Sequence, residues 1–212
     1  MKLMLNKNEI LSIIAITIIL AFMISVTNLS ELFIYSLIFV FIIILLNIIT
    51  KKIVSSFFNS EIEVKLWKFK RYGFEKKSIF KTVFQAGIFM PIIITGFSFA
   101  RIPTWMASLV FEVKPKMHKT KKTHDIYNFS EMTDSQIGII AATGIIINLV
   151  AAVISYFIGF ENFTKLSIYF MLYNLIPISE LDGNKIFSGS IVLWSFLASI
   201  VLIGLGFIFF VV

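Results

Sequence analysis

The stretch "YNLIPISELDGNKIF", residues 173–187, places a carboxylate, Asp182, inside a very apolar chain. A charged group that faces lipid is costly, so an ionisable residue at such a depth indicates a functional site. Asn174 and Pro177 favour the end or a kink of a helix, and the Asn amide is suited to the carbonyls that the break leaves unpaired. Gly183 permits a tight turn or a close approach of another segment. The alternative is that Asp182 only caps the final helix near a membrane surface.

The composition indicates an integral membrane protein. The chain has 212 residues, of which 58% are hydrophobic, and its mean hydropathy is +0.93, whereas about half of the residues of a soluble domain are apolar. Several apolar runs reach about 20 residues, the length that crosses a bilayer core. We therefore expect one membrane-embedded domain, residues 1–212, with a peripheral first helix (1–30), a core (31–190) and a final helix (191–212).

The net charge of +7 fits a membrane topology better than a nucleic-acid surface. Most of the 19 lysines and arginines lie between Lys51 and Lys122 and flank apolar segments, which is the bias of cytoplasmic loops. We therefore predict a multi-pass protein of the cell membrane with its amino terminus and basic loops in the cytoplasm. The expected partners are lipid and a membrane protein, because no aromatic and basic platform for nucleic acid accompanies the charge. The lack of cysteine excludes disulfides and thiolate metal sites.

Apolar runs predict an all-α membrane fold with five to six transmembrane helices and a small β-strand or hairpin element at the membrane. The helices that we expect cover residues 8–26, 32–54, 137–158, 163–178 and 191–212. Segment 84–100 contains Gly87, Pro91 and Gly96, and we favour a re-entrant segment over a full crossing because re-entry keeps the following lysines in the cytoplasm. Polar and apolar residues alternate over 61–66, which is the pattern of a half-buried strand.

The opening stretch resembles the Asn-x-x-Pro-x-x-x-Leu-Asp-Gly signature of the site-2 protease family, the zinc metalloproteases that cleave within membranes. The chain keeps every fixed position of this signature, namely Asn174, Pro177, Leu181, Asp182 and Gly183. The resemblance covers residues 32–212 and implies the helical bundle of that family.

Two further stretches are similar to features of the same family. The family has Gly-Pro-x-x-Asn at the start of a core helix, and the chain has "GIIIN", which keeps Gly144 and Asn148 but has Ile145 in place of proline. The stretch "GFSFARIP" resembles a Phe-Ala-x-Pro segment of small archaeal-type members.

The resemblance implies a zinc site that this chain has lost. The family uses two histidines of a His-Glu-x-x-His helix and the aspartate of Leu-Asp-Gly as zinc ligands, with the glutamate as general base on the bound water. By chain order this motif falls on "NIITK", where the matching residues are Asn47, Ile48 and Lys51. An amide is a poor zinc ligand, isoleucine accepts no proton, and an ammonium repels a dication. Asp182 then remains alone at the position of the third ligand.

The two histidines offer a weak replacement for the lost ligands. His118 and His124 lie six residues apart in a lysine-rich segment, which neither forms a helix-face pair nor attracts a dication. We favour solvated loop histidines. A sharper hypothesis is that the Lys51 ammonium takes the place of the zinc charge and pairs with Asp182, with Asn47 hydrogen-bonding nearby. The other possibility is that Lys51 extends to the cytoplasmic interface.

These observations favour a non-proteolytic relative of the site-2 proteases that binds or regulates a membrane partner, with no catalytic residue and no cofactor. Strand 61–66 would pair with an extended client segment by strand addition. Two alternatives stay open. One is an active intramembrane zinc endopeptidase with ligands other than those of the motif. The other is a small transporter or channel component, against which sparse intramembrane charge and the lack of repeat symmetry argue.

Overall fold

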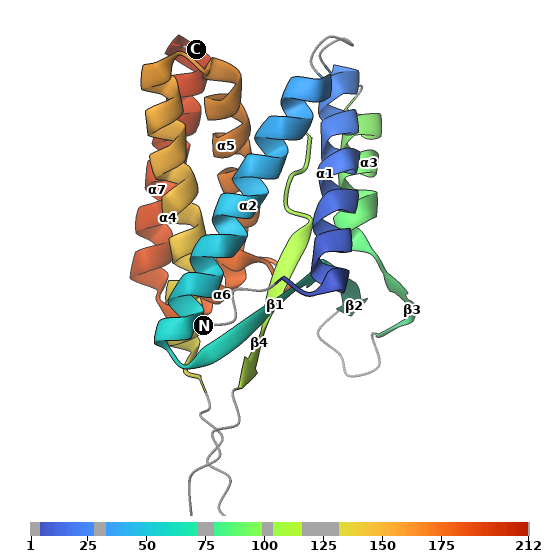
Figure 1. Cartoon of the computed structure of the whole chain (residues 1–212), viewed down its shortest axis with the longest axis vertical. Coiled ribbons are helices and arrows are strands. Elements are labelled where there is room, and N and C mark those ends of the chain that lie inside the picture. The colour runs from blue at the N-terminus through green and yellow to red at the C-terminus, as the bar shows by residue number, and fades with distance from the viewer. Residues whose placement is uncertain (1–4, 28–32, 72–78, 99–103, 116–131, 212) are drawn as a thin grey trace, which may run out of the picture.

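A computed structural model of the chain describes residues 5–27, 33–71, 79–98, 104–115 and 132–211. Most of these residues are helical, and the long helices stand above two small antiparallel sheets in the view of Figure 1. The helices are α1 (Lys7–Thr27), α2 (Phe33–Phe57), α3 (Ala86–Phe97), α4 (Asp134–Ile158), α5 (Glu161–Asn174), α6 (Asp182–Gly189) and α7 (Ile191–Val211). The strands are β1 (Ser60–Leu66), β2 (Phe69–Arg71), β3 (Ile79–Phe84) and β4 (Leu109–Pro115).

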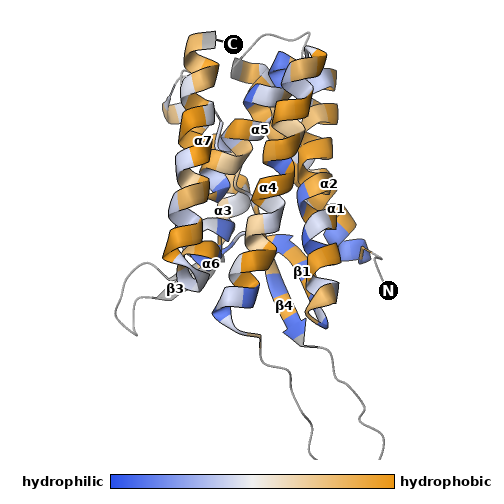
Figure 2. Cartoon of the chain, turned by 90° about the vertical axis from the view of Figure 1, so that its left-hand side faces the viewer, coloured by the Kyte–Doolittle hydropathy of each residue, from blue (hydrophilic) through white to orange (hydrophobic). Residues whose placement is uncertain are grey.

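Four helices, α1, α2, α4 and α7, are long and apolar enough to cross a bilayer. Figure 2 shows hydrophobic residues along the whole length of these helices. The structure is therefore compatible with the membrane protein that the composition predicts. Helices α3 and α5 have 12 and 14 residues, or about 18 and 21 Å at 1.5 Å per residue, which is less than the roughly 30 Å of a bilayer core. A total of five to six crossings stays a prediction.

Helix α4 begins earlier than the sequence analysis placed it, because Thr133 and Gln136 form a capping box. The Thr133 hydroxyl accepts the Gln136 backbone N–H, and the Gln136 side chain accepts the Thr133 N–H. This reciprocal pair satisfies two donors that a helix start otherwise leaves unpaired. The helix stops at Gly159, whose φ of 92° is in the left-handed region that glycine adopts without strain.

Strand β1 confirms the strand predicted over 61–66, and its partner is β4. The two run antiparallel from Ser60 opposite Pro115 to Leu66 opposite Leu109. One face of the pair is apolar and packs into the helical bundle. The other face carries ion pairs, with Lys114 Nζ 2.6 Å from Glu63 Oε2 and Lys65 Nζ 2.5 Å from Glu112 Oε2. The sheet thus has an apolar face that packs against the helices and a charged face on its other side.

Candidate functional site

Lys51, near the end of α2, and Asp182, at the start of α6, form a buried ion pair. The Lys51 ammonium donates to Oδ2 of Asp182, and the two residues are 5% and 2% exposed. The hypothesis that Lys51 pairs with Asp182 is therefore confirmed, and the alternative that Lys51 extends to the interface is wrong. Asp182 is the first residue of α6, a short helix that the sequence analysis did not predict, and it does not cap the final helix α7.

Helix α4 meets this ion pair at Gly144. A Cβ atom at that position would lie 2.4 Å from Cε of Lys51 and 2.6 Å from Nδ2 of Asn47, so the absence of a side chain allows α2 and α4 to approach. Three stretches that the sequence analysis singled out separately thus supply residues to one place. Asn148, one turn beyond Gly144, is completely buried, and its amide nitrogen and oxygen have no hydrogen-bond partner in the described part of the chain.

The signature residues around Asp182 form the corner between α5 and α6. A Cβ atom on Gly183 would lie 2.1 Å from the carbonyl oxygen of Leu175, so the expected close approach is present. Asn174 Nδ2 donates to the Phe170 carbonyl at 2.8 Å, as expected of an amide at a helix end. Helix α5 ends at Asn174 rather than at the predicted residue 178, and Pro177, which has no N–H to continue a helix, lies in the exposed connection.

Leu181, the remaining signature residue, is completely buried. It packs in a cluster with Trp67 and Trp105, whose rings stack with centroids 5.9 Å apart. This cluster fixes the start of α6 against the residues that flank strands β1 and β4. The position of Asp182 is therefore set by apolar packing on one side and by Gly183 on the other.

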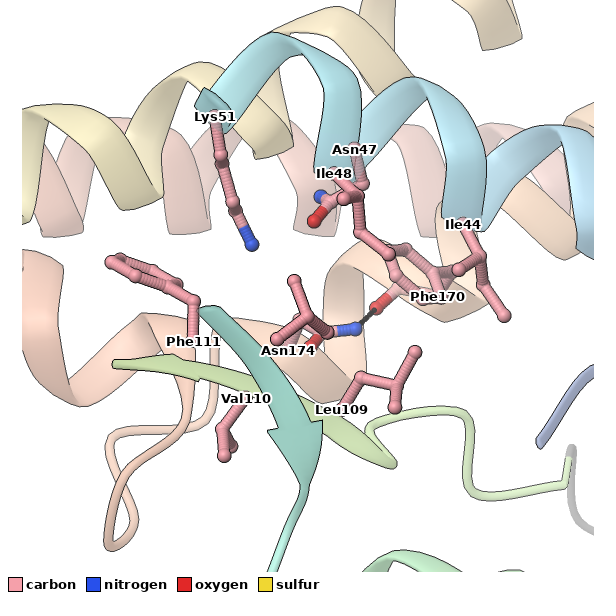
Figure 3. A pocket seen from close by; sticks show the side chains of 10 residues that line it. Ile44, Asn47, Ile48, Lys51, Leu109, Val110, Phe111, Phe170 and Asn174 are labelled. Atoms are coloured by element: carbon pink, nitrogen blue, oxygen red, sulfur yellow. Dashed lines mark hydrogen bonds between the residues drawn. The ribbon is translucent and has the colours of Figure 1, made fainter. Parts of the chain in front are cut away.

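A small pocket lies beside the ion pair, between the end of α2, strand β4 and α5 (Figure 3). It has about 20 Å³ of free space, which is enough for roughly one water molecule. Its polar lining consists of Asn47, Lys51 and Asn174, and its apolar lining includes Ile48 and Phe111. The amide nitrogen of Asn47 has no hydrogen-bond partner in the part of the chain that the structure describes. The hydrogen bond that we expected of Asn47 is therefore not made by this nitrogen to any described residue.

Phe111 and Lys185 also belong to the site, and the sequence analysis missed both. The ammonium groups of Lys51 and Lys185 lie 5.1 and 3.8 Å from the centroid of the Phe111 ring, within the range of cation–π attraction. Lys185 also donates to the Phe111 carbonyl. The available signal was the spacing of Asp182 and Lys185, because residues three apart share a face of a helix.

The buried part of the site holds two ammonium groups and one carboxylate. Lys51 and Lys185 lie beside Asp182, and the more exposed carboxylates of Glu180 and Glu112 act on Lys185 from farther away. Burial lowers the pKa of Lys185 to about 8, with Asp182 opposing that shift and Lys51 adding to it. Lys51 thus has Asp182 as a close counter-ion, whereas no carboxylate of the described residues lies within 4.0 Å of the Lys185 ammonium.

These residues do not fit a zinc ion. Asp182 is the only zinc-type ligand among the described residues of the site, and the Lys51 ammonium occupies one of its oxygens and repels a dication. Ile48, at the position of the general base, contributes only hydrocarbon to the pocket. Across the residues that the structure describes, no group of three or more His, Cys, Asp or Glu is placed to hold a metal ion. His118 and His124 lie outside the described residues.

What the site does chemically follows from its own residues. It offers a buried ion pair, a second ammonium on a backbone carbonyl, and beside a small pocket the Asn47 amide nitrogen, which has no partner among the described residues. Comparisons of the chain with protein-family models, curated proteins and solved structures give no match.

Proposed function

We propose that the protein is a non-proteolytic member of the site-2 protease family that binds an extended segment of a membrane partner. The observation that carries this proposal is the ion pair between Lys51 and Asp182. The resemblance assigns a histidine ligand to position 51 and the aspartate ligand to position 182. A lysine ammonium bound to that aspartate supplies a fixed positive charge but no open position for an activated water.

The ion pair supports the role of a scaffold. Removing one member of a buried ion pair costs about 3–5 kcal/mol, because the other charge stays buried without compensation. Lys51 therefore stabilises the arrangement in which α2 lies close to α4 and α6. In this role the ion pair keeps the helices around the pocket in place and takes no part in hydrolysis.

The β1–β4 sheet supports the binding of an extended segment. Its apolar residues Ile62 and Phe111 belong to the core of the bundle, and Phe111 also lines the pocket. The outer edge of a strand presents unpaired backbone groups, which are a template for an added strand. An extended client at this sheet would lie next to the ion pair. We also propose that the sheet and the basic loops face the cytoplasm.

The experiment measures zinc and peptide cleavage with the full-length protein in phosphatidylcholine nanodiscs. We expect far less than one zinc per chain by mass spectrometry, saturable binding of a fluorescent peptide of alternating valine and threonine, and no cleavage of that peptide. Stoichiometric zinc that is lost in Asp182→Ala, together with zinc-dependent cleavage, would overturn the proposal. The matched control is Asp134→Ala, which removes an exposed aspartate from the start of α4.

A further inference from the structure

The two edges of the β1–β4 sheet differ at the pair formed by Val64 and Phe111. The Trp67 N–H donates to the Ser108 carbonyl at 2.9 Å, which extends the ladder beyond the strands. Because hydrogen-bonded and non-hydrogen-bonded pairs alternate along an antiparallel ladder, Val64 and Phe111 form a non-hydrogen-bonded pair. The backbone N–H and C=O groups of these two residues therefore do not bond each other. Those of Val64 face the outer edge of β1, and those of Phe111 face the outer edge of β4.

The edge of β1 is closed by α1. Glu9, which is 2% exposed, accepts the Val64 N–H at 2.8 Å through Oε1. Its other oxygen, Oε2, accepts the Asn6 N–H and the Lys52 ammonium, each at 2.7 Å. These three donors, one of which is the counter-ion Lys52, bind both oxygens of the carboxylate. An incoming strand at this edge would have to displace α1.

At Phe111, the outer edge of β4 is bound by a side chain of α6. Lys185 donates to the Phe111 carbonyl, which is the acceptor that an added strand would use. Lys51 and Lys52 each have a carboxylate within hydrogen-bond distance. Within the described residues, no carboxylate lies within 4.0 Å of the Lys185 ammonium. The lowered pKa of this group, about 8, agrees with a buried cation that lacks a close counter-ion.

We propose that the outer edge of β4, at Phe111 and Lys185, docks the partner, and that the partner presents an acidic side chain within an extended segment. This inference rests on the proposed function and specifies its recognition chemistry. A backbone N–H of the partner replaces the ammonium as donor to the Phe111 carbonyl. The ammonium of Lys185 then pairs with the partner's carboxylate.

The Phe111 ring makes this exchange a local movement. The ring centroid lies 3.8 Å from the Lys185 ammonium, so the cation keeps this contact when it leaves the carbonyl. The incoming carboxylate also gives Lys185 a close counter-ion, which Asp182 does not supply because it is bound to Lys51. Charge complementarity is therefore the reason for an acidic partner rather than a neutral or basic one.

The test uses the full-length protein in phosphatidylcholine nanodiscs and four fluorescent peptides of alternating valine and threonine. Three differ only in a central Glu, Gln or Lys, and the fourth is the Glu peptide with every backbone nitrogen methylated. We expect the Glu peptide to bind about tenfold more tightly than the Gln peptide, which corresponds to about 1.4 kcal/mol. The Lys peptide should bind most weakly of the three, and the methylated peptide should not bind, because it lacks the donors that pair with a strand edge.

Two variants assign the preference to Lys185. Lys185→Met should bind the Glu and Gln peptides equally, and Lys185→Glu should prefer the Lys peptide. Lys114→Met is the matched control, because Lys114 lies on β4, the strand of Phe111, but pairs with Glu63 on the opposite face of the sheet, and it should keep the wild-type preference. Unchanged circular dichroism and melting temperature would show that each variant is folded.

The possible failures are distinguishable. Equal binding of the Glu and Gln peptides to the wild type, with sensitivity to backbone methylation, would overturn the acidic partner and leave the proposed function standing. Binding of the methylated peptide as tightly as its parent would overturn docking at the β4 edge. No saturable binding of any peptide would overturn the proposed function and this inference together.

Discussion

The ammonium of Lys51 is bound to the carboxylate of Asp182, a residue 131 positions away in the sequence, and both residues are buried. A charge pair of this kind is not a strong source of stability by itself, because both groups lose their hydration. The pair instead favours one arrangement of the helices, since each buried charge is tolerated only next to the opposite charge. The pair therefore ties the end of α2 to the start of α6.

Removing one member of this pair should be far more harmful than removing both. Lys51→Met and Asp182→Asn keep the size of the side chains, and each single change should lower the free energy of unfolding by about 3–5 kcal/mol, because the remaining charge is buried alone. The double variant should cost clearly less than the sum of the two. Reversible unfolding in mixed micelles measures these values.

The control for this comparison of single and double variants is Lys65→Met, on the exposed face of the sheet. Lys65 is 43% exposed in its side chain and pairs with Glu112 and Glu63, and exposed pairs contribute at most about 1 kcal/mol. A double variant that is destabilised by the full sum of its single changes would contradict a coupled pair.

The glycines around the site should tolerate a methyl group to different degrees. Gly183→Ala should be the most harmful, because its Cβ would meet the backbone oxygen of Leu175, which cannot move without shifting α5. Gly144→Ala should cost about 1–3 kcal/mol, since the flexible Lys51 side chain gives way only partly. Gly206→Ala is the control, because nothing lies within 4 Å of that position, and it should be neutral or slightly stabilising. Melting temperatures in the reverse order would contradict the close approach of these helices.

The sequence predicts the parts of the fold that local pattern and charge determine. The long helices follow from uninterrupted apolar runs. The pairing of Lys51 with Asp182 was a hypothesis that came from the resemblance, which places both residues at positions of zinc ligands, and from the need of a buried carboxylate for a cation. Strand β4 was missed because its pairing with β1 joins segments more than forty residues apart, and such pairing leaves little local signal. Helix α6 was missed because Gly183 and Gly189, at its two ends, lower the helix propensity of a very short segment.

The same limit explains why Lys185 was not assigned to the site. Its role depends on Phe111, which is brought to it by the β1–β4 pairing. Glu9 is a similar case, because its contact with the Val64 N–H joins the first helix to a strand. Contacts of this type follow from tertiary packing and are not visible in spacing along the chain.

Glu9 should control the accessibility of the β1 edge. Glu9→Ala removes the acceptor of the Val64 N–H and the counter-ion of Lys52. We expect faster hydrogen exchange at the Val64 amide, because a backbone donor without a partner opens to solvent more often. Hydrogen exchange of the full-length protein in nanodiscs, resolved by mass spectrometry of fragmented peptides, measures this rate. The Lys65 amide, which points into the ladder, is the internal control, and equal changes at both amides would indicate general unfolding instead.

Lys185 should make stability depend on pH in the alkaline range. Its pKa is lowered from the ordinary 10.5 to about 8 by burial, so between these values the unfolded chain binds more protons than the folded one. Stability should therefore rise as the pH increases from about 8 to 10.5, by an amount on the order of 1–2 kcal/mol.

The same stabilisation is lost as the pH falls through 8, where the folded protein must keep a buried ammonium. Lys185→Met has no group to titrate and should lack the rise, whereas Lys114→Met should keep it, because Lys185 is unchanged in that variant and Lys114 lies on the exposed face of the sheet. Unfolding free energies of the three proteins at pH 8 and pH 10 test this expectation. A rise that persists in Lys185→Met would show that another group is responsible, and would remove one reason for regarding Lys185 as a cation that lacks a counter-ion.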